Sequence, residues 1–399
     1  MASDDNGAAQ DFIDKAISNS ELEFQTKSYK DVTYRLNPDS GAVGIVGDFV
    51  VIGGEEGFKS VVDTEAGGES LESSDRYTDT EQRLTDDRLA TLYFDARPLD
   101  KLLQRSAGAA GMDLSALGLS QDPVGAALFV GPDRIVFESN SKLPTGAAGA
   151  VPAAIARGSG LLAELPGGSW GAFGLPDFGR LIDTGFQQFA AGFAAASGAD
   201  PSQLEQQFEA QTGLNFQDDI VGWMGDLGVF VQGSDLTTVG GGIVIESKDP
   251  ATSAATLKRI GELIEGQAGA RLRPLTLPGV EGFSIQEPGM PQPINFVAAD
   301  RVVIAYGNEA TQAALGSGDT LDDSPTFQAA SSALGDGFST SAYFDIAAIV
   351  TFAEAAGGFS GEETYQADVK PWLDPLSFVA AGSKVEDGRT TQRFIIGVE

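Results

Sequence analysis

The stretches Leu92-Tyr93-Phe94-Asp95 and Ala342-Tyr343-Phe344-Asp345 are nearly the same tetrapeptide, placed far apart in one chain of 399 residues. Each has residues that favour a strand, followed by an aspartate that can begin a helix. A second pair agrees: Gly47-Asp48-Phe49-Val50-Val51-Ile52 corresponds to Ala299-Asp300-Arg301-Val302-Val303-Ile304. The pairs keep the same order along the chain, which indicates an internal duplication.

The sequence around these anchors follows the same plan in both places. After each apolar strand come a glycine turn, a short helical stretch and an acidic stretch that holds one leucine. Corresponding segments, first copy before second, are 32–36 with 280–285, 56–62 with 308–315, 69–72 with 319–322, and 122–123 with 374–375. Small shifts between the matches are what loop insertions would produce.

A shorter repeat is nested inside the longer one. Residues 219–230 and 368–379 each carry an aspartate, a tryptophan and an apolar strand at the same spacing, with Trp223 answering Trp372. A strand that ends in aspartate precedes each of them. The module therefore predicts a strand, an aspartate, a helix, a Trp-bearing helix and a hairpin, and residues 88–142 form a third copy without the tryptophan.

These repeats predict an α+β fold of antiparallel or mixed sheets, with helices packed on one face and about one and a half copies of one unit. Residues 144–160 are rich in Ala, Gly and Pro and are interpreted as a linker. We expect the second unit, 161–399, to be complete. The first, 1–143, lacks a counterpart of 161–248, so we expect an uncovered apolar edge there.

Composition excludes several classes of function. The chain has no cysteine and no histidine, so disulfides, thiol nucleophiles, Ser-His-Asp triads and His-ligated zinc are ruled out. Its net charge of −32 disfavours nucleic acids and anionic membrane surfaces. The polar, acidic N-terminal residues are unlike a signal peptide, and no run reaches the length of a membrane helix, so the sequence predicts a soluble chain.

The pattern Val46 to Lys59, with Leu71 to Asp75, Asp86-Asp87-Arg88 and Gly213 to Phe230, resembles an uncharacterised bacterial family, domain of unknown function 3352. The resemblance covers most of the chain, duplication included. It implies an extracytoplasmic protein tethered by one N-terminal membrane helix, with no assigned activity. From the residues printed, we expect that anchor and the first half-unit to be missing here, and the resemblance implies no catalytic or binding residues.

Two short motifs could suggest catalysis. Asp183-Thr184-Gly185 matches the aspartic-protease signature, but a second copy is absent and the neighbouring Leu181, Ile182 and Phe186 continue a helical pattern. Ser139-Asn140-Ser141-Lys142 has the Ser-x-x-Lys spacing, but at the end of a strand. We interpret both motifs as structural.

Other polar groups are also interpreted as structural. Asp95, Asp177 and Asp345 each follow a strand and are predicted to cap a helix, although carboxylates at strand ends could be catalytic. The acidic stretches 69–75 and 319–323 could offer oxygens to Ca²⁺ but lack the EF-hand spacing. Gly240-Gly241-Gly242 lacks the Lys and Ser/Thr of a phosphate-binding loop. We therefore predict no catalytic residue, no cofactor site and no metal site.

The aromatic residues leave one further idea open. Trp223 and Trp372 are interpreted as core anchors, and the 24 Phe against 7 Tyr indicate buried aromatics. The leading hypothesis is a non-enzymatic extracytoplasmic domain that binds a partner or supports an envelope structure. The alternative is a carrier of a lipid or other apolar ligand, in a cavity between sheet and helices. The third hypothesis is a carboxylate-dependent hydrolase. The sequence does not identify a partner protein, an apolar ligand or an oligomeric state.

Overall fold

The computed structural model describes residues 2–20, 22–39, 41–95, 97, 122–143, 153–197, 200, 202–268, 271–277, 280–357 and 364–399. The chain divides into two compact units, called here unit 1 (Met1–Asp79) and unit 2 (Thr80–Glu399). Each has a sheet and a core of its own.

Unit 1 is a four-stranded antiparallel sheet in the order β1-β2-β3-β4. Its elements are α1 (Asn6–Ser18), β1 (Gln25–Tyr29), β2 (Val32–Asn37), β3 (Gly41–Val46), β4 (Phe49–Gly53), α2 (Glu55–Glu65) and the 3₁₀ turn η1 (Leu71–Ser73), with α3 (Asp75–Glu81) crossing into unit 2. Phe58 and Val62 of α2 are buried against Tyr34, Leu36 and Val46. This cluster is the core of unit 1.

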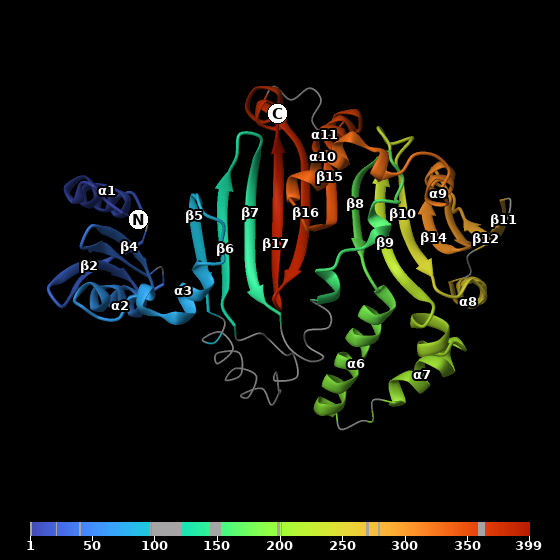
Figure 1. The fold of residues 1–399 in the computed structure, drawn as a ribbon, viewed down its shortest axis with the longest axis horizontal. Coiled ribbons are helices and arrows are strands. Elements are labelled where there is room, and N and C mark those ends of the chain that lie inside the picture. The colour runs from blue at the N-terminus through green and yellow to red at the C-terminus, as the bar shows by residue number, and fades with distance from the viewer. Residues whose placement is uncertain are drawn as a thin grey trace. The chain divides into compact units, whose positions relative to one another are not determined.

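Unit 2 is built on a thirteen-stranded sheet in which every pairing is antiparallel (Figure 1). The order of its strands is β11-β12-β13-β14-β10-β9-β8-β15-β16-β17-β7-β6-β5. The strands are β5 (Ala90–Phe94), β6 (Val124–Val130), β7 (Arg134–Lys142), β8 (Ser169–Leu175), β9 (Met224–Gln232), β10 (Gly240–Ser247), β11 (Leu272–Leu277), β12 (Val280–Ile285), β13 (Ile294–Ala298), β14 (Arg301–Tyr306), β15 (Ser339–Asp345), β16 (Leu376–Glu386) and β17 (Arg389–Val398).

Helices connect these strands. They are η3 (Gly160–Leu162), α6 (Phe178–Ser197), α7 (Ser202–Thr212), η4 (Phe216–Val221), α8 (Pro250–Leu263), η5 (Ile264–Ala268), α9 (Asn308–Ala314), η6 (Leu321–Asp323), α10 (Pro325–Leu334), α11 (Ile346–Ala355), η7 (Tyr365–Val369) and α12 (Lys370–Leu373). Local chemistry sets their starts. Asp249 accepts hydrogen bonds from the backbone N–H groups of Ala251 and Thr252, and Pro250 opens α8.

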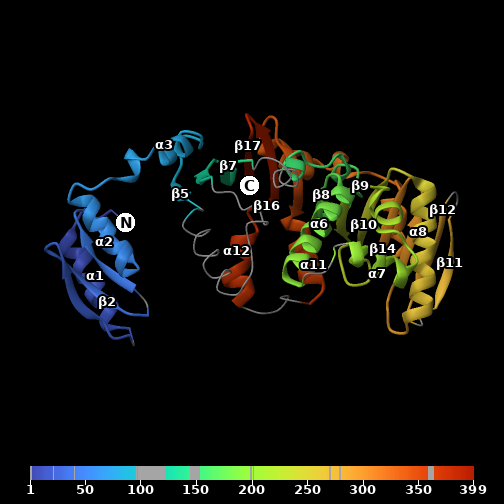
Figure 2. The same ribbon diagram turned by 90° about the horizontal axis from the view of Figure 1, so that it is seen from below.

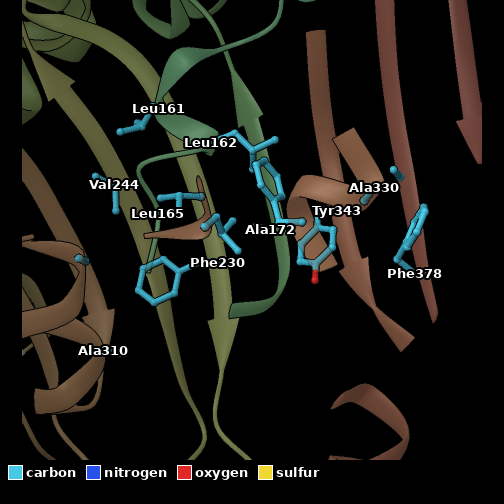
Figure 3. Packing of buried hydrophobic residues seen from close by; sticks show 14 of the residues in the cluster. Leu161, Leu162, Leu165, Ala172, Phe230, Val244, Ala310, Ala330, Tyr343 and Phe378 are labelled. Carbon is cyan, nitrogen blue, oxygen red and sulfur yellow. The ribbon is translucent and has the colours of Figure 1, made fainter. Parts of the chain in front are cut away.

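The main core of unit 2 lies on one face of its sheet (Figure 3). Phe230, Val244 and Tyr343 project from the strands and pack against buried side chains of η3, α9 and α10. Phe327 of α10 meets Tyr343 edge to face, with ring centroids 5.3 Å apart. Burial of the Tyr343 hydroxyl raises its pKa far above the ordinary value.

A second cluster lies on the opposite face, where Leu257 of α8 packs against Trp223, Leu227 and Ile245. Figure 2, which looks along the strands, shows α11 and α12 below β16 and β17. The α+β class and the antiparallel sheets are therefore confirmed. The prediction that the helices pack on one face of the sheet is wrong for unit 2. Its sheet presents apolar side chains on both faces, and helices pack against each of them.

The same order of elements occurs twice in the chain. A helix, four strands, a helix, a 3₁₀ turn, a helix and a strand follow one another from α1 to β5 and, with η5 added after the first helix, from α8 to β15. Two paired strands come later in each run, β6 and β7 in the first and β16 and β17 in the second, where α11, η7 and α12 precede them. In the second run, β10, β9 and β8 lie between β14 and β15 and join the four strands to the three. That the two runs superpose stays a prediction.

The compact units divide at a place other than the predicted linker. Residues 144–152 of that linker lie outside the described residues, whereas Ala154 and Ala156 are buried in unit 2. Ser383 of β16 donates a hydrogen bond to the carbonyl of Ala156. The division into compact units falls after Asp79, because β5, β6 and β7 pair into the large sheet. The predicted division into repeated units, residues 1–143 and 161–399, concerns the repeats in the sequence and stays a prediction.

Candidate functional site

Two rows of side chains cross neighbouring strands on one face of the unit 2 sheet. The strand register places side by side Ala90, Leu128, Phe137, Phe394 and Ala381. All five are apolar, and each comes from a different strand, from β5 to β16. Because residues two apart on a strand share a face, the next row lies on the same face.

The second row is partly polar. It consists of Leu92, Ala126, Ser139, Gln392 and Ser383. Neither row contains an ionisable side chain, although the chain carries a net charge of −32. The two rows therefore form an uncharged strip with hydroxyl and amide groups along one side.

This strip is the floor of a groove of about 530 Å³, which Ile155, Glu138 and Arg393 also line. Glu138 and Arg393 alternate with the residues of the two rows, so their side chains point to the other face of the sheet. Leu92 is 65% exposed, Phe137 46% and Phe394 41%. The rings of Phe137 and Phe394 lie 6.1 Å apart and tilted. Apolar side chains of this size that remain in water, gathered in one concave place, mark a surface that can bind an apolar molecule.

The other face of the same strands is held by a buried ion pair. Arg393 donates to the Glu138 carboxylate at 2.8 Å, and the Thr85 hydroxyl donates to it at 2.8 Å. The Glu138 side chain is 3% exposed, and the Arg393 guanidinium also covers the ring of Phe338. Removal of one partner of such a pair is costly, so the pair ties β7 to β17 beneath the groove.

The two catalytic motifs form no site. Asp183 lies within α6, and its carboxylate accepts a hydrogen bond from Gln217 at 2.8 Å. The helical interpretation of this motif is therefore confirmed. Ser139 and Lys142 both lie in β7, where residues three apart point to opposite faces. The serine and the lysine of that motif cannot meet.

The three aspartates after strands have different roles. Asp95 accepts a hydrogen bond from the backbone N–H of Arg97, and Asp345 accepts one from that of Ala348. The capping prediction is wrong for Asp177, whose carboxylate accepts from Arg180 and Lys248 instead. A φ of +53° at Asp177 places its side chain in this different direction. These two hydrogen bonds lower the pKa of Asp177.

The three carboxylates do not converge. Asp345 ends β15, and its neighbour β8 runs antiparallel to it, so Asp177 lies at the opposite end of the sheet. Asp95 follows β5, six strands away from β8 in the sheet order. At about 4.8 Å per strand, this separates Asp95 from Asp177 by well over 20 Å. They cannot act together on one substrate.

The acidic stretches and the glycines are parts of the fold. Thr320 and Asp323 form a capping box at η6. Within the described residues, no group of three or more carboxylates could hold a metal ion. A Cβ at Gly241 would lie 2.5 Å from the carbonyl oxygen of Phe230, so this glycine allows β9 and β10 to approach closely.

The two tryptophans differ. Trp223 is 4% exposed and donates its indole N–H to the carbonyl of Asp219, which confirms it as a core anchor. Trp372 is 78% exposed, so the same interpretation is wrong for it. The hairpin that follows Trp223 leads into α8, which packs on it. The hairpin that follows Trp372 is contacted by α10 and α11, but no helix buries Trp372 itself in the described part of unit 2.

Sequence reasoning did not find the groove. The sequence carries one signal of the groove, the run Phe394-Ile395-Ile396. Consecutive apolar residues of this kind indicate a strand with apolar side chains on both faces. Ile395 is fully buried, whereas Phe394 lines the groove. The other lining residues come from separate strands, and only the register brings them together.

The fold and the groove define a class of protein: an α+β protein whose extended antiparallel sheet leaves a mainly apolar groove open to water. A model of the family described as "Protein of unknown function (DUF3352)" matches residues 1–396, so the chain belongs to that family. No curated protein matches this chain. A solved structure, TP0453 in its crystal form III, is similar with a TM-score of 0.28 and 8% identity, over 59% of this chain and 92% of that one.

Proposed function

We propose that this protein is a non-enzymatic extracytoplasmic binding protein, and that the groove of unit 2 binds an uncharged apolar ligand such as the acyl chains of a neutral lipid. The observation that carries the proposal is the charge-free concave strip in which Leu92, Phe137 and Phe394 stay exposed. A groove of about 530 Å³ lies within the usual size range of small-molecule sites.

The physical chemistry of the strip favours such a ligand. Burial of each methylene group contributes about 0.8 kcal/mol, so an acyl chain laid along the apolar row would gain several kcal/mol. Ser139 and Gln392, in the second row, can form hydrogen bonds with the ester or hydroxyl of a neutral headgroup. The net charge of −32 repels anionic headgroups, which favours neutral over acidic lipids.

The extracytoplasmic location is part of the proposal and is supported by the resemblance described above. No helix in the described residues is long and apolar enough to cross a membrane. The three carboxylates that could have formed a hydrolytic site are far apart, which is why a binding function is preferred to a hydrolase.

The test is ligand retention with matched variants. We expect native mass spectrometry of the gently purified chain to show bound neutral lipid, and an apolar fluorescent probe to compete with that lipid. Leu92→Asp places a charge in the groove and should abolish both signals. Leu236→Asp is the control, because Leu236 is similarly exposed, at 59%, but lies between β9 and β10 outside the groove.

Two results would contradict the proposal. One is equal lipid retention by Leu92→Asp and the unmodified chain. The other is an unmodified chain that neither carries lipid nor binds the probe. Either result would favour the other hypothesis, in which the protein binds a partner protein or supports an envelope structure.

A further inference from the structure

The floor of the groove in unit 2 changes in character from one end to the other. Over β5 and β6, at the edge of the sheet, it is formed by the apolar side chains of Ala90, Leu92, Ala126 and Leu128. Thr91 lies between two of these residues, so its side chain points to the other face. An apolar chain that runs toward this edge therefore meets only carbon on the floor beneath it.

The opposite end of the groove is polar. Ser139 of β7 pairs with Gln392 of β17, and Gln392 pairs with Ser383 of β16. Ser341 of β15, the next strand, also lines the groove. One uncharged polar side chain thus comes from each of four neighbouring strands, which lie about 4.8 Å apart.

Two of these four side chains have already used their only hydrogen. The Ser383 hydroxyl donates to the carbonyl of Ala156 at 3.2 Å, and the Ser341 hydroxyl donates to the carbonyl of Ala381 at 3.2 Å. A serine hydroxyl has one hydrogen and two lone pairs, so both can now only accept. Ser383 is 5% exposed, so little water reaches the lone pairs that it keeps.

The other two side chains are free to bind a ligand. In the part of the chain that the structure describes, neither the Ser139 hydroxyl nor the Gln392 amide has a hydrogen-bond partner. An ester or ether group of a ligand only accepts, so it would leave the lone pairs of Ser341 and Ser383 unmatched. A headgroup with several hydroxyls donates as well as accepts and can match all four side chains.

We propose, on the basis of the binding function above, that the ligand is a neutral glycolipid. Its uncharged sugar lies over Ser139, Gln392, Ser383 and Ser341, and its apolar chain runs toward Leu92. A sugar fits better than a glycerol ester because it holds several hydroxyls on one rigid ring, so a single ordered group supplies donors to several side chains.

The test compares two soluble compounds that differ in their hydrogen-bond donors. One is decyl β-glucoside, and the other is the same compound with every hydroxyl methylated, which keeps the oxygens as acceptors but cannot donate. Titration calorimetry on the full chain, below the micelle concentrations, measures both affinities. We expect the glucoside to bind more tightly, although methylation makes the second compound more apolar.

Variants at the polar end should remove this preference. Gln392→Leu keeps an exposed side chain of similar size without polar atoms, so it should weaken binding of the glucoside about tenfold and affect the methylated compound much less. Ser139→Ala should act in the same direction. Gln206→Leu is the matched control, because Gln206 is exposed on α7 and does not line the groove.

Leu92→Ala tests the direction in which the ligand lies. It removes apolar surface at the other end of the groove, so both compounds should bind several-fold more weakly, and the ratio of their affinities should stay as in the unmodified chain. A loss of the preference for the glucoside in Leu92→Ala would overturn the proposed orientation.

The outcomes separate the headgroup from the binding function itself. Equal affinities for the two compounds, unchanged by Gln392→Leu, would overturn the sugar headgroup while apolar binding stands. Tighter binding of monodecanoylglycerol than of the glucoside would also overturn it, in favour of glycerol. If the chain binds neither compound nor the apolar fluorescent probe, the headgroup and the binding function are both wrong.

Discussion

Asp323 shows how single side chains fix the local structure of this acidic protein. Its carboxylate accepts hydrogen bonds from the backbone N–H of Thr320 at 2.9 Å and from the Thr320 hydroxyl at 3.0 Å. These two hydrogen bonds lower its pKa below the ordinary value of 3.8. The sequence of this loop allows a calcium site, but in the structure the Asp323 carboxylate accepts hydrogen bonds within the turn.

The lowered pKa of Asp323 leads to a prediction about acid stability. A carboxyl whose pKa is lower in the folded than in the unfolded state stabilises the fold above its unfolded pKa, and this contribution is lost as the pH falls through the folded pKa. Asp323→Asn should therefore lower the unfolding temperature at neutral pH and leave it nearly unchanged in strong acid. Calorimetry from neutral to acid pH measures this, with Asp322→Asn as the control. A temperature shift of the same size at every pH would contradict it.

Elements with similar sequences reach different environments. Trp223 follows η4 and Trp372 lies in α12, each just ahead of a strand. Leu257 of α8 packs in the cluster that holds Trp223, whereas Trp372 stays in water. Helix α8 follows β10 and packs in the cluster around Trp223, whereas none of the described helices buries Trp372.

This difference predicts unequal costs of mutation. Trp223→Ala leaves a cavity and removes the indole hydrogen bond to the Asp219 carbonyl, which keeps its bond from the Thr256 hydroxyl, and should cost about 3–5 kcal/mol in the free energy of unfolding. Trp372→Ala should change it by less than about 0.5 kcal/mol, as is usual for exposed residues. Urea unfolding of both variants measures the costs. Similar costs for the two would show that Trp372 is buried in solution.

At the scale of the whole molecule, the two units have separate cores. Phe58 is fully buried in unit 1, and Phe230 is 1% exposed in unit 2. All three tryptophans, Trp170, Trp223 and Trp372, lie in unit 2. Tryptophan fluorescence therefore reports on unit 2, while circular dichroism reports on both units.

We predict two unfolding transitions. Phe58→Ala should destabilise unit 1 by about 3–5 kcal/mol and lower a transition seen by circular dichroism but not by tryptophan fluorescence. Phe230→Ala should lower the transition seen by both methods. A single transition that both variants shift together would show that the two units unfold as one.

Much of the local structure could be predicted from the sequence. The α+β class, the antiparallel hairpins, the Asp249-Pro250 helix start and the Asp345 cap depend on neighbouring residues. Their signals are periodicity and hydrogen bonding over a few positions, which a single sequence displays directly. The helical setting of Asp183 was predictable for the same reason, because its apolar neighbours recur at helical spacing.

The sequence by itself thus determined the elements and their order, and it excluded thiol and histidine chemistry by inventory. Tertiary structure decided which surfaces became covered. Leu92, Phe137 and Phe394 form one groove only because β5, β6, β7 and β17 pair in one register. Ile52 is exposed, whereas Ile304 in the matching strand packs against a cluster, because β10 pairs with β14. Burial depends on partners far away in the chain, and strand pairing between distant segments is set by packing of the whole sheet, which no local pattern specifies.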